Sequence, residues 1–376
     1  MSGLRPDVDP EGLLEFSVVY TDRSLNHMSG AFQQVMRDLS AQLKTVYNAK
    51  SVAIVPGSGT SGMEAVARQF ATDQKVLVIR NGWFSYRWSQ IFEMGRIPRE
   101  ELVCKAQFAA QEPESHLAPM AIEEVVNTIL HEQPAVVFAP HVETSAGMIL
   151  PDGYIKAVAD AAHKVGALFV LDSIASGAIW VDMQANGVDV LISAPQKGWS
   201  GSPCCGLVMM SETARQRLDD SSSTSFTLDL KKWTQIMETY EAGAHAYHAT
   251  MPTDGLRQLR DVMAEAQQFG FEKLKLAQQT LGDKARAVLA RRGIKSLAAD
   301  GFGAPGVIVS YTRETDIQNG SRFARAGFQI AAGVPLQVDE PESFKTFRIG
   351  LFGIDKLMNV ERTLETLEEG LNKVGL

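Results

Sequence analysis

The chain has 376 residues, of which 45% are hydrophobic and 21% are charged, and its formal net charge at neutral pH is -8. This length and composition are typical of a globular protein with a large core, most naturally divided into two domains, and they exclude a disordered or fibrous chain. No block of Lys or Arg resembles the basic surface that binds a nucleic-acid backbone, so we expect small-molecule chemistry or protein contacts.

The N-terminal segment MSGLRPDVDPEGLLEFSVVY carries early acidic residues and lacks the apolar core of a signal peptide. We expect residues 1–21 to form an irregular N-terminal arm that could pack on a partner subunit. Nowhere do about 18 uninterrupted apolar residues occur, so no membrane segment is expected. Cys104, Cys204 and Cys205 are badly spaced for a disulfide framework and form no CxxC metal motif, which fits a reducing cytoplasm.

Short apolar segments between residues 50 and 211 predict the strands of one sheet. In chain order they are VAIVPG, KVLVIR, ELVCKA, AVVFAP, ALFVLDS, VLISAP and GLVMMS. Amphipathic stretches such as SGMEAVARQFA and DGYIKAVADAAHKVG lie between most of them and predict helices. Wholly apolar strands that alternate with helices predict a mostly parallel sheet with helices on both faces. We therefore assign residues 22–270 to a large, doubly wound α/β domain.

The pattern changes in the last third of the chain. A long helical run, LRQLRDVMAEAQQFGFEKLKLAQQTLGDKARAVLARRG, is followed by the strand-like GVIVSYT and the helical SRFARAGFQIAA. The strand-like FKTFRIGLFG and a final helix, VERTLETLEEGLNKV, complete the chain. This order predicts a smaller α+β domain over residues 271–376.

The segments that follow the apolar runs are expected to hold the functional groups, because ligands bind beyond the carboxyl ends of the strands in an open α/β sheet. The first is PGSGTSG, which places small residues and hydroxyls at a strand-to-helix turn. Free backbone N–H groups and the helix dipole favour an anion there. A phosphate could sit on Gly59 and Thr60, and a plain N-cap by Ser61 or Thr60 is the alternative.

Two later strands end at residues of opposite charge. Asp172 ends a buried strand, where a carboxylate could cap a turn or pair with the protonated ring nitrogen of a pyridine cofactor. Lys197 follows the next strand, beside Gln196 and between apolar residues. Desolvation there would lower the pKa of Lys197 and make its amine nucleophilic toward an aldehyde, whereas a solvated loop lysine is the alternative.

Three further segments supply chemistry of the same kind. In NGWFSYR, Trp83 or Phe84 could stack on a planar cofactor. In HVETSAG, Thr144 and Ser145 could bond a phenolate oxygen. In FRIGLFG, Arg348 could bind a substrate carboxylate, or pair with an acidic residue of the protein itself. Together with the preceding groups these are the parts that a pyridoxal phosphate enzyme requires.

The motifs GSGTSGMEA, NGWFSYR, ETSAG followed by LP, LDSIAS, QKG, YHATMP and FRIGLFG resemble, in order and spacing, those of a known family. That family is the class V aminotransferases of the fold type I pyridoxal phosphate enzymes, and the resemblance is to its alanine–glyoxylate and serine–pyruvate branch. The resemblance implies a large domain with a mostly parallel, seven-stranded sheet, and pyridoxal 5'-phosphate as the cofactor.

The resemblance also implies a role for each site residue. Lys197 forms the Schiff base with the cofactor and Asp172 pairs with the pyridinium nitrogen, while Arg348 binds the substrate α-carboxylate. The other implied cofactor contacts are Ser58, Gly59, Thr60 and Gln196 at the phosphate, Phe84 and Ile174 on the two ring faces, Thr144 near the ring oxygen, and Tyr247 and Thr250 at the phosphate of the partner's site. Sites completed across an interface imply a homodimer.

The implied reaction transfers an amino group from a small amino acid, of the alanine or serine type, to a 2-oxo acid such as glyoxylate or pyruvate by a ping-pong mechanism. Another pyridoxal phosphate reaction, by a lyase or a desulfurase-like enzyme, is the alternative; a desulfurase needs a cysteine in the second domain, and residues 271–376 contain none. The segment EFSVVYTDRSLNHMS and the SPCCG after the lysine depart from the family pattern next to the expected substrate pocket, so the amino donor stays open.

Overall fold

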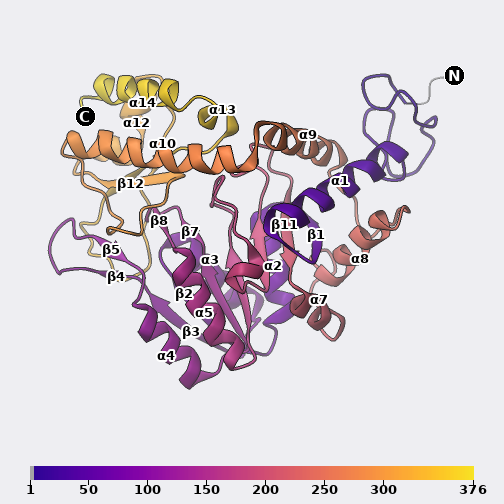
Figure 1. Ribbon diagram of the computed structural model, residues 1–376, viewed down its shortest axis with the longest axis horizontal. Helices are drawn as coiled ribbons and strands as arrows, with labels where there is room; N and C mark the ends of the chain where they lie inside the picture. Colours follow the sequence, from indigo (N-terminus) through magenta and orange to yellow (C-terminus); the bar gives the residue numbers. More distant parts are fainter. Residues whose placement is uncertain (1–3) are drawn as a thin grey trace.

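A seven-stranded sheet forms the centre of the computed structural model, which describes residues 4–376 (Figure 1). Its strand order is β1–β11–β10–β9–β6–β2–β3. The strands are β1 (Ser51–Pro56), β2 (Lys75–Arg80), β3 (Glu100–Lys105), β6 (Val136–Pro140), β9 (Leu168–Asp172), β10 (Val190–Ser193) and β11 (Cys205–Met210). Each corresponds to one predicted apolar segment, so the predicted fold class is confirmed. β11 is antiparallel to β1 and β10, and the remaining pairs are parallel.

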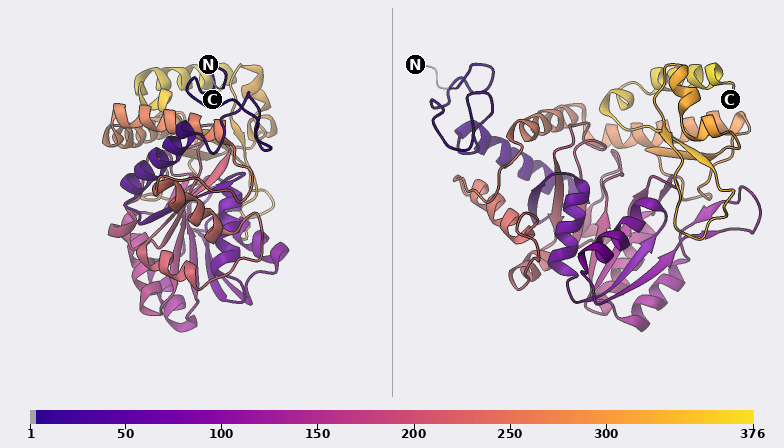
Figure 2. Two further views of the ribbon diagram at one scale, coloured as in Figure 1. Left: turned by 90° about the vertical axis from the view of Figure 1, so that its right-hand side faces the viewer. Right: turned by 180° about the vertical axis from the view of Figure 1, so that it is seen from behind.

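Helices flank this sheet on both sides in the edge-on view of Figure 2. They are α1 (Gly30–Tyr47), α2 (Gly59–Phe70), α3 (Trp83–Gly95), α4 (Ile122–Glu132), α5 (Asp152–Lys164), α6 (Met183–Asn186), α7 (Glu212–Asp219), α8 (Leu230–Glu241) and α9 (Thr253–Phe269). Short strands β4 (Gln107–Phe108), β5 (Leu117–Ala118), β7 (Val142–Glu143) and β8 (Met148–Ile149) form two small hairpins beside the main sheet. Because strands such as β6 and β9 are buried along their whole length, the sheet needs apolar cover on both faces.

The C-terminal third is built on one long helix, α10 (Phe271–Arg291), which runs across the top of Figure 1. It is followed by β12 (Val307–Tyr311), α11 (Thr315–Gln318), α12 (Ser321–Arg325), β13 (Ala331–Ala332), β14 (Thr346–Gly350), α13 (Ile354–Leu357) and α14 (Val360–Val374). Strand β14 lies between β12 and β13 in an antiparallel sheet. The predicted helical run breaks at Gly270, whose φ is 109°, between α9 and α10. The domain division at residue 270 stays a prediction.

One expected helix is much shorter than its sequence pattern suggested. The segment SRFARAGFQIAA was expected to be helical throughout, but the helix ends at Arg325. Gly327 has a φ of 87°, a conformation that favours glycine and ends the helix. The last two residues of the segment instead form β13 against β14, so pairing with a strand outweighed the local helical pattern.

The N-terminal arm projects from one end of the molecule (Figure 1). Residues 4–29 contain neither a helix nor a strand before α1 begins. Leu13, Phe16 and Val18 are 88%, 90% and 100% exposed, respectively. In residues 4–376, no helix combines the length and the apolar character needed to cross a membrane.

Helix α2 approaches the sheet closely because two glycines face one another. A Cβ atom added at Gly206 of β11 would lie 2.8 Å from the Cα atom of Gly62 and 2.9 Å from the carbonyl oxygen of Ser58. Both of these atoms belong to the backbone, so neither can rotate away. The start of α2 is therefore held against the sheet at the position of the PGSGTSG motif.

We expect Gly206→Ala to lower the free energy of unfolding by about 1–3 kcal/mol, because the methyl group pushes α2 off the sheet. Urea unfolding of the protein without ligands measures this change. Gly153→Ala is the matched control, since a Cβ at Gly153 of α5 would meet no atom within 4 Å, and it should change stability by no more than about 1 kcal/mol. Equal effects of the two substitutions would show that the close approach does not constrain α2.

Candidate active site

The parallel strands bring the predicted side chains to one edge of the sheet. Asp172, the last residue of β9, is paired with Pro140 of β6 on one side and with Ile192 of β10 on the other. The segment containing Thr144 follows β6, and Lys197 follows β10. Residues from three adjacent strands therefore meet where the carboxyl ends of the strands open, as the ligand-binding rule for such sheets predicts.

Lys197 lies half-buried between two aromatic rings. Its Nζ atom is 5.7 Å from the centre of the Phe84 ring and 5.8 Å from the centre of the Phe352 ring. Burial lowers the pKa of Lys197, and the nearby carboxyl groups of Asp172 and Glu143 oppose this change. A lower pKa leaves more of the lysine as the free amine at neutral pH, which is its nucleophilic form.

Asp172 is buried at the end of β9, with 8% of its surface exposed. Its Oδ1 atom accepts a hydrogen bond of 3.0 Å from the backbone N–H of Ile174, so it does cap the following turn. Burial raises the pKa of Asp172 to about 6, although this hydrogen bond and the charge of Lys197 act in the opposite direction. Within the described chain, Oδ2 has no hydrogen-bond partner, and a proton donor on a ligand could satisfy it.

The N-terminus of α2 is open to an anion. Ser58 is its N-cap, because the Ser58 hydroxyl accepts a hydrogen bond of 3.3 Å from the N–H of Ser61; the alternative of an N-cap by Ser61 or Thr60 is therefore wrong. The backbone N–H groups of Gly59 and Thr60 have no hydrogen-bond partner in residues 4–376. The Thr60 hydroxyl accepts a hydrogen bond of 3.1 Å from Nη1 of Arg87. Two free N–H groups and a guanidinium therefore meet at one helix end.

Gly59 and Ile174 are packed against each other beside this helix end. A Cβ atom added at Gly59 would lie 2.6 Å from Cδ1 of Ile174, so a larger residue would require the Ile174 side chain to move. Ile174 comes directly after the buried Asp172 and Ser173. The contact therefore connects the predicted anion site to the turn that carries Asp172.

Phe84, the second residue of α3, lies between three cationic side chains. The Cζ atoms of Arg87 and Arg348 are 5.1 and 5.5 Å from the centre of its ring, and Lys197 is at a similar distance. Among the described residues, neither arginine has an acidic group within 4 Å. Nε of Arg348 donates a hydrogen bond of 2.7 Å to the carbonyl of Ala332, which leaves its terminal nitrogen atoms for an anion.

Glu143 has a buried carboxylate, only 1% exposed, at the start of the loop after β6. Its two oxygens accept hydrogen bonds from the backbone N–H groups of Phe84, Ser85 and Ser145 and from the hydroxyls of Ser85 and Ser145. The adjacent Thr144 is also buried, with 5% of its surface exposed. The loop that carries Thr144 is therefore hydrogen-bonded to the helix that carries Phe84.

Glu143 and Arg87 were not identified from the sequence, although both lie inside quoted motifs. The hydroxyl groups of HVETSAG and the aromatic rings of NGWFSYR are the more obvious cofactor contacts in these motifs. The sequence does carry a signal for Glu143. A carboxylate directly after a buried strand has a desolvation cost like that of Asp172, so it needs hydrogen-bond or charge partners. Arg87 carried a signal too, because it follows Phe84 by three residues and shares its helix face.

Tyr247 and Thr250 lie apart from these residues, on the exposed segment between α8 and α9. Their hydroxyl groups are 3.1 Å apart, and the Tyr247 ring packs on His27 with 5.5 Å between ring centres. Tyr247 is 53% exposed. Neither of these contacts involves Lys197, and the place of both residues in a partner's site stays a prediction. Gln196, next to Lys197, is also exposed.

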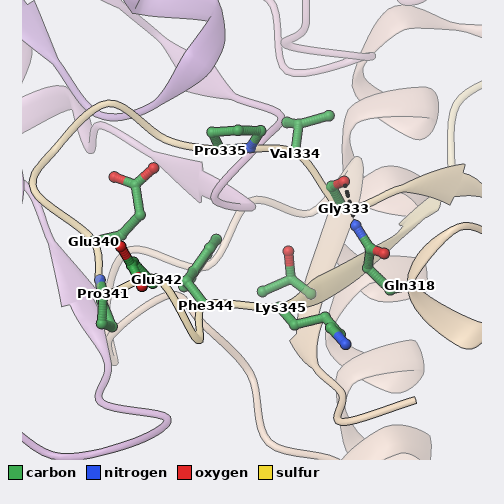
Figure 3. A pocket seen from close by; sticks show the side chains of 10 residues that line it. Gln318, Gly333, Val334, Pro335, Glu340, Pro341, Glu342, Phe344 and Lys345 are labelled. Carbon is green, nitrogen blue, oxygen red and sulfur yellow. Dashed lines mark hydrogen bonds between the residues drawn. The ribbon is translucent and has the colours of Figure 1, made fainter. Parts of the chain in front are cut away.

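Two cavities near β14 lie outside the candidate site. One, of about 300 Å³, is lined by Gln318 and the loop 333–346, where Nε2 of Gln318 donates a hydrogen bond of 3.2 Å to the carbonyl of Gly333 (Figure 3). A larger one, of about 950 Å³, lies between the β4–β5 hairpin and residues 339–345. Neither contains any of the predicted site residues. The chemistry of the side chains at the sheet edge, and not cavity size, therefore defines the site.

Comparisons with known proteins agree on one family. The class V aminotransferase family model matches residues 14–300. The chain is 28% identical over 352 residues to the 2-aminoethylphosphonate–pyruvate transaminase of Vibrio parahaemolyticus, covering 90% of this chain and 88% of that one. It is 26% identical to the alanine–glyoxylate aminotransferase of Callithrix jacchus, covering 92% and 82% of the two chains. A solved alanine–glyoxylate aminotransferase from Nostoc superposes with a TM-score of 0.76 at 21% identity, covering 92% and 89%.

The buried carboxyl of Asp172 should destabilise the protein at alkaline pH when no ligand is bound. Its pKa of about 6 lies above the ordinary 3.8, so the cost of ionising it is absent below pH 4 and complete above pH 6. Asp172→Asn should therefore raise the free energy of unfolding by about 3 kcal/mol at pH 8, and this gain should disappear toward pH 4. Urea unfolding across this pH range measures it.

Asp189→Asn provides the matched control. Asp189 is equally buried, but its Oδ2 atom accepts hydrogen bonds of 2.9 Å from the N–H of Phe169 and from Nε2 of His163. Its substitution should destabilise the protein at both ends of the pH range. If Asp172→Asn destabilises the protein in the same way, the account of Asp172 as an unsatisfied buried acid is wrong.

Proposed function

The chain belongs to the class V aminotransferases, which use pyridoxal phosphate to transfer an amino group to a 2-oxo acid, and from that premise we propose its substrates and the roles of its residues. The proposed donor is a small amino acid of the alanine or serine type, and the acceptor is pyruvate or glyoxylate. The observation that carries this proposal is that Lys197 and Arg348 both lie over the ring of Phe84, while Asp172 is close enough to Lys197 for their charges to interact.

The residues at the sheet edge fit pyridoxal phosphate by their chemistry. A dianionic phosphate needs N–H donors and positive charge, which the start of α2 and Arg87 provide. A protonated pyridine nitrogen needs a carboxylate, and an aldehyde needs an amine. The residues that would hold the cofactor are Ser58, Gly59, Thr60, Arg87 and Gln196 at the phosphate, Phe84 and Ile174 on the ring, Thr144 at the ring oxygen, Asp172 at the ring nitrogen and Lys197 at the aldehyde.

When bound, the cofactor supplies an electron-poor ring that accepts the charge left on the amino acid after its α-proton departs. The chain itself binds the substrate and moves the proton. The forked guanidinium of Arg348 matches a carboxylate and would hold it in one orientation. Burial lowers the pKa of Lys197, which favours its amine form, and its Nζ would be the base that takes the α-proton and returns a proton in the second half of the reaction.

Asp172 has the supporting electrostatic role. Oδ1 is fixed by the N–H of Ile174, so Oδ2 would face the ring nitrogen and keep that nitrogen protonated. A ligand cation at this position would also remove the cost of the buried negative charge. Asp172 destabilises the protein without the cofactor and would therefore stabilise the protein with the cofactor bound.

An aminophosphonate is a second candidate donor. One of the relatives with matching length is named for 2-aminoethylphosphonate, and the site holds two guanidinium groups, those of Arg87 and Arg348, without an acidic partner within 4 Å in the described chain. A phosphonate dianion would bind either group as well as a carboxylate does. The family assignment does not favour the lyase or desulfurase-like alternative.

The proposed assembly is a homodimer in which the YHAT segment reaches the partner's site. Tyr247 and Thr250 are exposed and lie away from Lys197 of their own chain. The exposed apolar side chains of Leu13, Phe16 and Val18 on the N-terminal arm support burial against a second copy. We also propose a cytoplasmic location, which the three free thiols of the chain support.

Absorption spectroscopy tests the proposed reaction. The protein with pyridoxal phosphate should show a visible band, and the true donor should remove that band and leave the aminated cofactor. L-Alanine, L-serine and 2-aminoethylphosphonate are added one at a time. Lys197→Ala should have neither the band nor turnover, because Lys197 is the proposed source of the amine, whereas Lys156→Ala on the surface of α5 should behave like the wild type.

A wild-type protein that forms no visible band would contradict the cofactor site. Conversion of an amino acid with release of ammonia, and without formation of the aminated cofactor, would instead support a lyase. A response to 2-aminoethylphosphonate alone would select the second candidate donor. The results therefore distinguish a failure of the proposed cofactor site from an error in the proposed reaction or amino donor.

Mixed dimers test the exchange of residues between subunits. Lys197→Ala is inactive, and the double variant Tyr247→Phe, Thr250→Ala should bind the cofactor weakly. If the YHAT segment serves the partner, a dimer with one subunit of each kind contains one intact site, so mixing the two variants should restore activity at low cofactor concentration. If mixing restores nothing while sedimentation confirms subunit exchange, the segment does not complete a partner's site.

A further inference from the structure

Helix α3 has no side-chain cap of its own, because its N-cap residue is Gly82. The loop after β6 takes over that role. The N–H of Trp83 donates to Oγ of Ser145 at 2.9 Å, the N–H of Phe84 to Oε1 of Glu143 at 3.2 Å, and the N–H of Ser85 to Oε2 of Glu143 at 2.8 Å. The first three N–H groups of α3, which a helix leaves unpaired, are thus all satisfied by one loop.

The same carboxylate holds its own loop in place. Oε1 of Glu143 also accepts hydrogen bonds from the N–H and the hydroxyl of Ser145, at 3.1 and 2.7 Å, and Oε2 accepts one of 2.7 Å from the hydroxyl of Ser85. All of these partners are donors, which is the pattern that an ionised carboxylate requires. A negative charge at the first turn also suits the dipole of α3.

Gly82, Ser145 and Glu143 are tightly packed against one another. A Cβ atom added at Gly82 would lie 2.2 Å from Oγ of Ser145 and 2.8 Å from Cγ of Glu143. Under the proposed function, the side chains of these two segments that would contact the cofactor are Phe84 on α3 and Thr144 on the loop. Their separation therefore depends on the length and the acceptor oxygens of Glu143.

We propose that Glu143 is a positioning residue of the cofactor site: its carboxylate ties the backbone of Phe84 to the loop of Thr144 and so fixes the ring-stacking wall relative to the hydroxyl at the ring oxygen. This inference rests on the proposed function. The side chain of Glu143 touches neither cofactor nor substrate, and it acts through Phe84 and Thr144. The carboxylate also adds a negative charge near Lys197 and Arg348.

Two substitutions separate the length of Glu143 from its charge. Glu143→Gln keeps the length but loses the charge and one acceptor, so its amide group faces at least one N–H donor. Glu143→Asp keeps the charge and both acceptors but is shorter by one methylene group. If position is what matters, both variants are defective. Glu101→Gln is the matched control, because Glu101 is also partly buried and hydrogen-bonded to α3, through Ser89, but belongs to the edge strand β3, whereas Lys197 follows β10.

Two readouts are needed, and one of them does not involve the cofactor. Hydrogen exchange of the cofactor-free protein reports on the amides of Trp83, Phe84 and Ser85, which should exchange about tenfold faster or more in both Glu143 variants. Titration with pyridoxal phosphate, followed by the visible band, should give a dissociation constant raised about tenfold or more in both. Glu101→Gln should change neither quantity.

The possible results distinguish a positioning role of Glu143 from a purely structural or a purely electrostatic one. Faster exchange with unchanged cofactor affinity would make Glu143 merely structural and overturn the inference. A normal affinity in Glu143→Asp alone would show that charge, not position, is what the site uses, and would also overturn it. Absence of the visible band in the wild-type protein would instead overturn the proposed function. That result does not depend on the Glu143 variants, so the two failures can be distinguished.

Discussion

The burial of Asp172 at the carboxyl end of β9 is the constraint on which the rest of the site depends. Burial raises the pKa of this carboxyl group, and its ionised form destabilises the protein when no ligand is bound. The neighbouring Lys197 cannot offset this fully, because its own burial lowers its pKa. A bound cation beside Asp172 would relieve the cost of its buried negative charge, and the same cation would favour the neutral amine form of Lys197.

The surrounding groups make the same site attractive to anions. The helices α2 and α3 both begin at this edge and direct their positive dipole ends toward it. Arg87 and Arg348 add charge on either side of Phe84, and Glu143 offsets part of it while closing the end of α3. Under the proposed function, the start of α2 would bind the phosphate of the cofactor and Asp172 would pair with its protonated ring.

The sequence predicted the sheet well because its strands are buried on both faces and so are apolar throughout. It also predicted that Asp172, Lys197 and Thr144 come together, since parallel strands end at a common edge. The sequence is less informative where contacts between distant segments determine the structure. The helix ending at Arg325 is short because β13 pairs with β14, and Glu143 is important because of donors that belong to α3, which is distant along the chain.

The covalent attachment of the cofactor to Lys197 is the central claim. Its most direct test is borohydride reduction of the protein with bound pyridoxal phosphate, followed by proteolysis and mass spectrometry of the peptides. The account predicts a single phosphopyridoxyl group on the peptide containing Lys197, and none on that peptide when the cofactor is first removed. A label spread over surface lysines, with the Lys197 peptide unmodified, would contradict the account.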